Sequence, residues 1–169
     1  MSFPSLTTER LLLRQLSESD KEQLFLLRSD DVINRYLDRP PCKSLDDAIS
    51  FVKTINENIK KKDSFYWAIA LTKSNKLIGT IGLFNFSDDL KRCEIGYELL
   101  NEYQGKGYMS ETIKKIIDFA MKTLGVKTIE AFTHKDNQSS TKLLERFNFV
   151  KTEIKDDNDP DFRVYRLGK

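Results

Sequence analysis

One stretch of the chain passes from an apolar strand pattern through a glycine-rich turn into a long amphipathic helix: Leu99-Leu100-Asn101-Glu102-Tyr103-Gln104-Gly105-Lys106-Gly107-Tyr108-Met109-Ser110-Glu111. Gly105 and Gly107 lack a Cβ atom, so the backbone can adopt unusual φ/ψ angles and approach a ligand closely. The helix that follows begins with unpaired N–H groups and the positive end of its dipole. These features together predict an anion cradle that suits a pyrophosphate, with the charge of Lys106 at its rim.

The glycine-rich turn is also compatible with a purely structural role, because two glycines can serve only to turn the chain from strand to helix. The turn is not a Walker P-loop, because no Gly-Lys-Ser/Thr follows four residues after a glycine. It is not a Rossmann fingerprint either, because Ser110 stands where the third glycine would be.

Length and composition indicate a single domain over residues 1–169 with a sizeable core. The 28 basic and 26 acidic side chains give a net charge of +2, which is too balanced to predict a nucleic-acid partner. No run approaches membrane-spanning length, so we expect a cytoplasmic protein without a membrane partner. Cys42 and Cys93 are far apart in the sequence and form no zinc motif, so no metal site is expected.

Hydrophobic periodicity predicts the element order β-α-α-α-β-β-β-α-β-α-β-β. Strands are expected at residues 9–16, 65–71, 77–83, 92–100, 126–133, 149–154 and 162–167. Helices are expected after caps at Ser17 and Ser44 and over residues 31–36, 107–124 and 137–147. Three meandering strands, a crossover helix and a further strand predict an α/β fold with a mixed sheet and helices on both faces.

Several sequence blocks resemble the GNAT N-acetyltransferase superfamily. Residues Gln104-Gly105-Lys106-Gly107-Tyr108-Met109 resemble its coenzyme A motif Gln/Arg-x-x-Gly-x-Gly/Ala, with Met109 where Gly or Ala is usual. That substitution fits if the methionine side chain points away from the phosphates. The blocks Glu94-Ile95-Gly96-Tyr97, Asn137-x-x-Ser140 and Leu144-Glu145-Arg146-Phe147-Asn148-Phe149 resemble the family's later blocks, although Phe147 and Asn148 replace Leu and Gly. Asn148 can keep the turn because asparagine tolerates a left-handed conformation.

The opening of the chain resembles one branch of that superfamily. Residues Thr8-Glu9-Arg10-Leu11-Leu12-Leu13-Arg14 look like the T-x-R-L-x-L-R opening of the branch that acetylates ribosomal-protein N-termini, the RimJ/RimL-like branch. The resemblance implies a GNAT fold with splayed central strands. It also implies direct transfer of an acetyl group from acetyl-CoA to an amine in a ternary complex.

The resemblance also implies the cofactor-binding residues. The pantetheine arm of acetyl-CoA would pair with the strand end Leu99, Leu100 and Asn101. The pyrophosphate would bind backbone N–H groups of the loop, namely those of Gln104, Gly105, Lys106, Gly107, Tyr108, Met109 and Ser110. A backbone N–H near Leu99 or Leu100 would stabilise the oxyanion. Asn137 would bond the pantetheine and Ser140 would donate to the sulfur or its proton. Alternatively, Asn137 or Asp136 caps the helix and Ser140 is an ordinary early-helix serine.

A general base must remove a proton from the acceptor, because an alkylammonium has no lone pair. The resemblance points to Glu94, ten residues before Gln104. Strand alternation places Glu98 on the same face as the second candidate, and a water relay is the third. Alternatively, Glu94 forms a structural ion pair, for example with Arg92 or Arg14.

Three further residues are of types that could serve in catalysis or substrate binding, but their positions suit structural roles better. The lone histidine, His134, suits a turn-capping or solvated role better than that of a base. Cys93 suits a packed core position better than a ping-pong nucleophile. Trp67 suits the core better than an acceptor pocket, which it could line with Tyr36 and the loop 38–41.

We therefore expect an acetyl-CoA-dependent N-acetyltransferase that acts as a monomer or homodimer. A protein N-terminal amine is favoured as the acceptor over a small amine such as a polyamine, amino sugar or amino acid. A non-catalytic acyl-CoA-binding sensor on the same fold is the alternative from another functional class, because a fold does not determine a function.

Overall fold

The computed structural model describes residues 3–37 and 39–168, so part of the loop expected at residues 38–41 lies outside the described residues. The chain forms an eight-stranded sheet in the order β1-β2-β3-β4-β5-β6-β8-β7. All neighbouring strands are antiparallel except β5 and β6, which are parallel. The strands are β1 (Leu6–Thr7), β2 (Leu11–Arg14), β3 (Phe65–Leu71), β4 (Leu77–Phe84), β5 (Arg92–Leu99), β6 (Thr128–His134), β7 (Val150–Lys155) and β8 (Phe162–Gly168).

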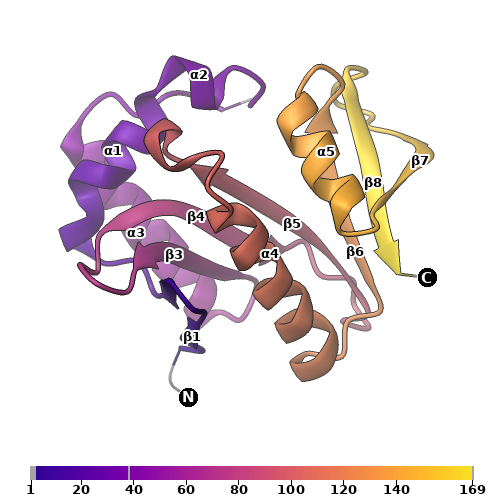
Figure 1. Ribbon diagram of the computed structural model, residues 1–169, viewed down its shortest axis with the longest axis horizontal. Helices are drawn as coiled ribbons and strands as arrows, with labels where there is room; N and C mark the ends of the chain where they lie inside the picture. The colour runs from indigo at the N-terminus through magenta and orange to yellow at the C-terminus, as the bar shows by residue number, and fades with distance from the viewer. Residues whose placement is uncertain (1–2, 38, 169) are drawn as a thin grey trace.

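Helices cover both faces of this mixed sheet, as predicted. Helices α1 (Lys21–Ser29), α2 (Asp31–Asn34) and α3 (Leu45–Lys60) precede the β3–β5 meander, and α4 (Tyr108–Asp118) and α5 (Gln138–Arg146) follow it. Figure 1 shows α4 and α5 in front of the sheet and α3 behind it. Two caps expected from the sequence are present: Ser17 forms a capping box before the 3-10 turn η1 (Glu18–Asp20) and Ser44 accepts a bond from the backbone N–H of Asp47.

Apolar side chains form a layer on each face of the sheet. The layer under α4 and α5 includes Trp67, whose indole N–H donates to the Pro4 carbonyl oxygen at 2.8 Å, so this residue belongs to the core as expected. The layer under α1 and α3 includes Leu24, Val52 and Leu77. In the described part of the chain, no helix combines the length and the apolar character needed to cross a membrane.

Three local features differ from the sequence-based expectation or refine it. The two-residue strand β1 was not predicted, because two residues carry no periodicity; it pairs with β2 through Leu6 and Leu13. The helix expected at 107–124 leaves the α-helical pattern at Asp118 and ends as a π-helical turn, Phe119–Thr123, followed by Gly125 at φ +77°. Asn148 adopts the expected left-handed conformation, with φ +68°.

The central strands β5 and β6 separate after a short parallel stretch. They pair only at Arg92–Thr128, Cys93–Ile129 and Glu94–Glu130. Beyond this point β5 remains paired with β4 as far as Leu99, whereas β6 remains paired with β8 as far as His134. The predicted splay is confirmed, and it leaves one edge of β5 without a partner strand among the described residues.

Candidate active site

The glycine-rich turn presents its backbone to open space at the start of α4. Gly105 and Gly107 have φ values of +75° and +83°, which L-residues with a Cβ rarely adopt. Gly107 is the N-cap of α4 and supplies no side-chain bond to the first N–H groups of the helix. A Cβ added to Gly105 would meet no atom of the described residues within 4 Å. The loop therefore has the conformation and the access that an anion cradle requires.

Several side chains near the loop pack against the core or form hydrogen bonds within the protein. Leu99 and Leu100 are buried, and the partly buried Met109 packs against the core. Gln104 Nε2 donates to the Leu99 carbonyl oxygen at 2.9 Å and fastens the loop to the end of β5. Asn101 Nδ2 donates to Asp30 Oδ2 at 3.0 Å, so its amide group is directed toward α2.

Two arginines that the sequence analysis did not identify flank the start of α4. Arg146, at the end of α5, donates from Nη1 to Ser110 Oγ at 3.0 Å. Arg10 donates from Nη2 to the Lys106 carbonyl oxygen at 3.1 Å. Arg146 adds positive charge at a helix N-terminus, where the dipole already favours an anion, whereas Arg10 is paired with Glu111.

The free edge of β5 offers peptide groups to the gap between the strands. The Leu100 N–H donates to the Ile78 carbonyl oxygen of β4 at 2.8 Å. Because N–H groups alternate in direction along an antiparallel strand, those of Tyr97 and Leu99 point away from β4, toward the gap. The expectation that the Leu100 N–H could serve an oxyanion is therefore wrong, and Leu99 remains as the candidate donor.

A pair of hydroxyl groups lies on the α5 side of the β5 edge. The hydroxyl oxygens of Tyr97 and Ser140 are 2.8 Å apart, and either can donate to the other. Burial raises the pKa of Tyr97 to about 12, with the Ser140 contact acting in the opposite direction. Tyr97 is therefore a neutral phenol and a potential proton donor at physiological pH. Asn137 Oδ1 accepts a bond from the Ser140 backbone N–H at 3.3 Å, which confirms its capping role.

Glu94 lies on the opposite face of β5, because side chains alternate along a strand. The side-chain amide of Asn85 donates to its carboxylate. Burial raises the pKa of Glu94, and the charges of Glu130 and Asp156 add to this effect. Glu130 is also its register neighbour on β6.

The two arginines expected as ion-pair partners of Glu94 bond elsewhere. Arg92 Nε lies 3.6 Å from Glu130 Oε1, and Arg14 Nη2 lies 2.7 Å from Asp20 Oδ1. The ion-pair interpretation of Glu94 is therefore wrong, and its carboxylate is bonded to an uncharged amide. This leaves Glu94 suitable as a proton acceptor, which remains a prediction.

Glu98, the second base candidate, is held in a buried charge cluster. Its carboxylate accepts bonds from Arg39 Nη2 at 2.5 Å and from Thr80 Oγ1 at 3.2 Å, and Arg28 Nη1 lies 3.9 Å away. Burial lowers the pKa of Arg28, and the neighbouring charge of Arg39 adds to this effect. Glu98 thus has a structural role in joining β5 to α1 and the segment after α2.

Glu94 also lines a cavity of ≈ 430 Å³ near the end of β6 and the start of β8. The other lining residues are Phe132, Asp156, Asn158, Asp159 and Phe162. Carboxylates and phenyl rings both interact favourably with a cation. The cavity can therefore receive an amine on the face that carries Glu94.

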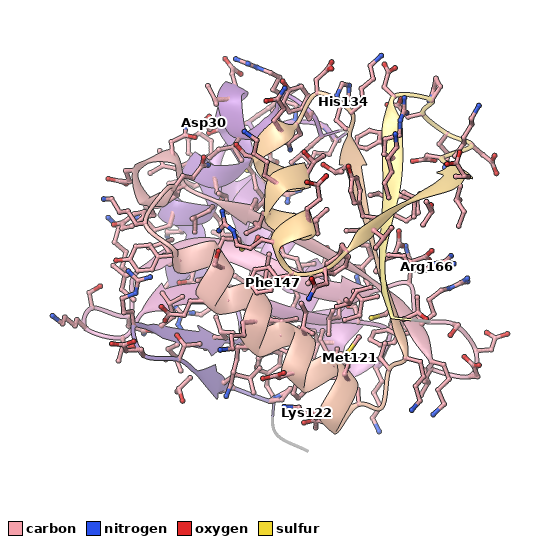
Figure 2. The ribbon with its side chains drawn as sticks, turned by 45° about the vertical axis from the view of Figure 1, so that its right-hand side comes forward. Asp30, Met121, Lys122, His134, Phe147 and Arg166 are labelled. Atoms are coloured by element: carbon pink, nitrogen blue, oxygen red, sulfur yellow. The ribbon has the colours of Figure 1, made fainter. Side chains whose placement is uncertain are left out.

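His134 and Cys93 take the structural roles that were favoured. His134 Nδ1 accepts a bond from the Asp136 N–H at 3.1 Å, and its ring stacks on Tyr36 at 4.8 Å between centroids. Figure 2 shows His134 at the same end of the molecule as Asp30, with Met121 and Lys122 at the opposite end. Burial raises the pKa of Cys93 to about 12, with the charges of Glu94 and Glu130 adding to it, so this thiol is no nucleophile.

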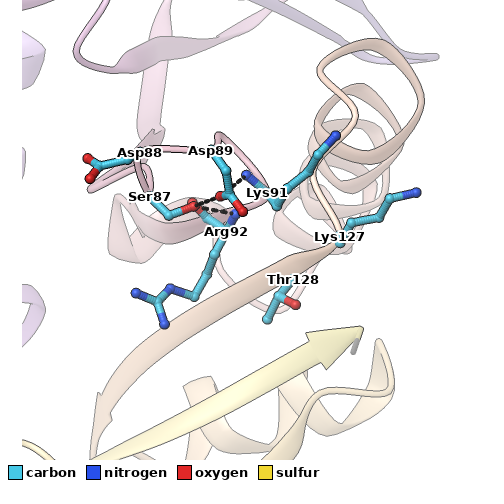
Figure 3. A pocket seen from close by; sticks show the side chains of 7 residues that line it. All are labelled: Ser87, Asp88, Asp89, Lys91, Arg92, Lys127 and Thr128. Atoms are coloured by element: carbon cyan, nitrogen blue, oxygen red, sulfur yellow. Dashed lines mark hydrogen bonds between the residues drawn. The ribbon is translucent and has the colours of Figure 1, made fainter.

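Figure 3 shows a second cavity, of ≈ 530 Å³, at the starts of β5 and β6. The glycine-rich turn follows the opposite end of β5. The polar groups of the cavity are used within a tight turn: the Ser87 hydroxyl donates to Asp89, and the Arg92 N–H donates to Ser87 Oγ at 3.0 Å. The cavity therefore offers no candidate for the chemistry indicated by the loop.

Comparison with known proteins identifies the family. Residues 10–150 match the family model described as "Acetyltransferase (GNAT) domain". The chain belongs to the GNAT acetyltransferases. YoaA of Bacillus subtilis, an uncharacterized N-acetyltransferase, is 36% identical over 149 residues, which span 88% of this chain and 84% of that protein.

Two further comparisons concern acetyltransferases of the branch that the opening motif resembles. The ribosomal protein uS5-alanine N-acetyltransferase of Escherichia coli is 27% identical over 157 residues, spanning 86% of this chain and 78% of that protein. The ribosomal L7/L12 α-N-protein acetyltransferase RimL, solved with coenzyme A, superimposes with a TM-score of 0.87 at 19% identity, covering 98% of each chain. The GNAT fold is thereby shown, and the relatives and the family model mark an acetyl-CoA-dependent N-acetyltransferase.

The loop generates a direct test. Gly107→Glu should weaken coenzyme A binding at least about 100-fold in isothermal titration calorimetry, because it places strain and a carboxylate in the anion cradle. Gly125→Glu is the matched control: Gly125 also has a positive φ of +77° and open space around it, but lies outside the loop. Wild-type affinity in the Gly107 variant would contradict the assignment of the loop.

Proposed function

We propose that this GNAT protein transfers an acetyl group from acetyl-CoA to the α-amine of a protein N-terminus, with both substrates bound at once. The observation that carries the proposal is the unpaired edge of β5. The glycine-rich loop lies at one end of this edge, the Tyr97–Ser140 pair on one face and Glu94 on the other. Such an edge can bind an extended ligand by strand addition.

A different set of protein groups would bind each part of acetyl-CoA, namely its pyrophosphate, its pantetheine arm and its acetyl group. The loop from Gln104 to Ser110 would hold the pyrophosphate through backbone N–H groups. The β5 edge from Leu99 to Asn101 would pair with the pantetheine arm, and Asn137 would bond to it from α5. The Leu99 N–H would stabilise negative charge on the acetyl oxygen, an interaction whose loss typically costs about 10²–10³ in rate.

The proton and electron balance assigns the remaining roles. Glu94 would take one proton from the acceptor ammonium, and the neutral nitrogen would then bond to the acetyl carbon as the carbon–sulfur bond breaks. The Tyr97–Ser140 pair would donate a hydrogen bond and then a proton to the leaving thiolate. Water would accept the second proton that the nitrogen loses and would return a proton to the pair. Because Glu94 and Ser140 lie on opposite faces of β5, the acceptor and the leaving group would be served from opposite sides.

The protein N-terminal acceptor is supported by the relatives and by the open acceptor side. Two of the similar proteins are described as acetyltransferases of ribosomal proteins. The cavity beside Glu94 is lined by carboxylates and by Phe132, which is 40% exposed.

We also propose that the protein acts in the cytoplasm, since both described cysteines are free thiols.

The test is release of free coenzyme A, followed with a thiol reagent, in the presence of acetyl-CoA and a panel of amines. We expect peptides with a free N-terminus to accelerate release, with a mass increase of one acetyl group at the α-amine. Acceleration only by small amines would reassign the acceptor. Tight binding of acetyl-CoA without release above hydrolysis by any amine would indicate a sensor instead.

Glu94→Gln should lower kcat/KM for the acceptor mainly at low pH. A base must be ionised, and burial raises the pKa of Glu94, so wild-type activity should fall as the pH drops through that raised pKa. The variant lacks the base and depends on amine that has already lost its proton, a fraction that grows with pH. We expect a loss of about 100-fold at the acidic end that shrinks at alkaline pH.

The matched control for that experiment is Glu153→Gln, which removes an exposed carboxylate from β7. It should leave the pH–rate profile unchanged. A Glu94→Gln profile parallel to the wild-type profile would assign the proton transfer to a water relay.

Ser140→Ala and Tyr97→Phe should each lower kcat about 10- to 100-fold while changing the acetyl-CoA Kd less than about threefold. Because the two hydroxyls act as one unit, the double variant should be little worse than the more damaging single variant. Ser139→Ala, which changes an exposed neighbour on α5, is the control. Equal losses in binding and turnover would show that the pair only positions the substrate.

A further inference from the structure

The opening motif Thr8-Glu9-Arg10 has no part in the proposed acetyl transfer, yet it contacts the start of α4. The Thr8 hydroxyl donates to Glu111 Oε2. The Arg10 backbone N–H donates to the same oxygen at 3.0 Å, and Arg10 Nε donates to Glu111 Oε1 at 2.9 Å. Both oxygens of a carboxylate in the first turn of α4 are therefore engaged by residues from the opening of the chain.

The guanidinium of Arg10 also reaches the glycine-rich loop itself. Its Nη2 donates to the Lys106 carbonyl oxygen at 3.1 Å. Its Cζ lies 4.1 Å from the centroid of the Tyr108 ring. A Cβ built on Gly107 would lie 3.4 Å from the same Nη2. One side chain thus contacts the residues on both sides of Gly107.

The bond to Lys106 fixes the direction of the peptide group between Lys106 and Gly107. In a trans peptide the C=O and N–H bonds point in opposite directions. Because Arg10 holds the Lys106 carbonyl oxygen, the Gly107 N–H is directed away from Arg10. Glycine imposes little conformational preference of its own, so this peptide needs an external contact to keep one orientation.

The ion pair with Glu111 has an electrostatic consequence for the same loop. A carboxylate in the first turn of a helix stabilises that helix through its dipole. It also repels an anion that binds at the same helix terminus. Arg10 neutralises this carboxylate and holds it against Thr8.

We propose that Arg10 is a positioning residue for the coenzyme: it orients the Lys106–Gly107 peptide and neutralises Glu111, so that the loop accepts a pyrophosphate. The inference rests on the proposed function in one respect, namely that acetyl-CoA binds to this loop. Arg10 need not touch the substrate for this role.

The test is the affinity of the full chain for coenzyme A, measured by calorimetry, together with steady-state kinetics. Arg10→Met should raise the Kd for coenzyme A and the KM for acetyl-CoA about tenfold, whereas kcat at saturating acetyl-CoA and the acceptor KM should change less than twofold. Arg10→Lys should recover only part of the affinity, because an ammonium cannot contact Glu111 and Lys106 with a rigid fork.

A second variant separates positioning from general destabilisation. Adding Glu111→Gln to Arg10→Met should lower the Kd for coenzyme A at least threefold relative to Arg10→Met alone. The reason is that the double variant no longer carries the unpaired carboxylate left by the loss of the arginine. Arg14→Met is the matched control on β2. It breaks the ion pair with Asp20 and should lower the melting temperature without changing the coenzyme A Kd.

Each outcome decides between the two proposals. If the wild-type chain binds coenzyme A and folded Arg10→Met binds it equally well, the positioning role is overturned while the proposed function stands. If Arg10→Met does not fold, Arg10→Lys decides alone, and unchanged affinity in that variant overturns the role. If the wild-type chain binds no coenzyme A, the proposed function fails before the role of Arg10 is tested.

Discussion

The separation of β5 from β6 after Glu94 is the constraint on which the rest of the structure depends. Buried peptide groups must be paired, so the peptide groups along the open edge of β5 must bond to water or to a ligand. The gap is stable because each strand is fastened elsewhere: β5 pairs with β4 from Glu94–Phe84 to Leu99–Gly79, and β6 pairs with β8 along its whole length. The two halves of the sheet are joined at only three residue pairs, and a ligand between them can complete the pairing.

Strand alternation turns this gap into a site with two sides. Glu94 and Tyr97 are three residues apart on β5 and therefore face opposite sides of the sheet. The Tyr97 side is covered by α5, which brings Ser140 within 2.8 Å. The Glu94 side opens into a cavity between β6 and the segment before β8. A single strand thereby separates the group proposed to accept a proton from the pair proposed to donate one.

Local patterns in the sequence predict much of this arrangement. The apolar periodicity of the helices, the caps at Ser17 and Ser44 and the two glycines act within a few residues, and each of these features is found where it was expected. The residues that were missed act over long sequence separations. Tyr97 meets Ser140, and Arg10 meets Glu111, only after the sheet has assembled. The Leu100 N–H was misassigned because its direction depends on the register of β5 against β4, which single-strand periodicity does not give.

The charges around Glu94 show how fold and chemistry are connected. Glu94 and Glu130 are register neighbours on adjacent strands, a pairing of like charges that costs stability. Arg166 and Arg92 both pair with Glu130, whereas Glu94 bonds to the neutral amide of Asn85. Burial, Glu130 and Asp156 then raise the pKa of Glu94 together, and this makes its carboxylate a stronger base. An ammonium entering the cavity would relieve this repulsion through its charge, and its proton would relieve it again on transfer to Glu94. The unfavourable charge density at the point where the strands part would therefore favour the role proposed for Glu94, which is to accept a proton from an amine.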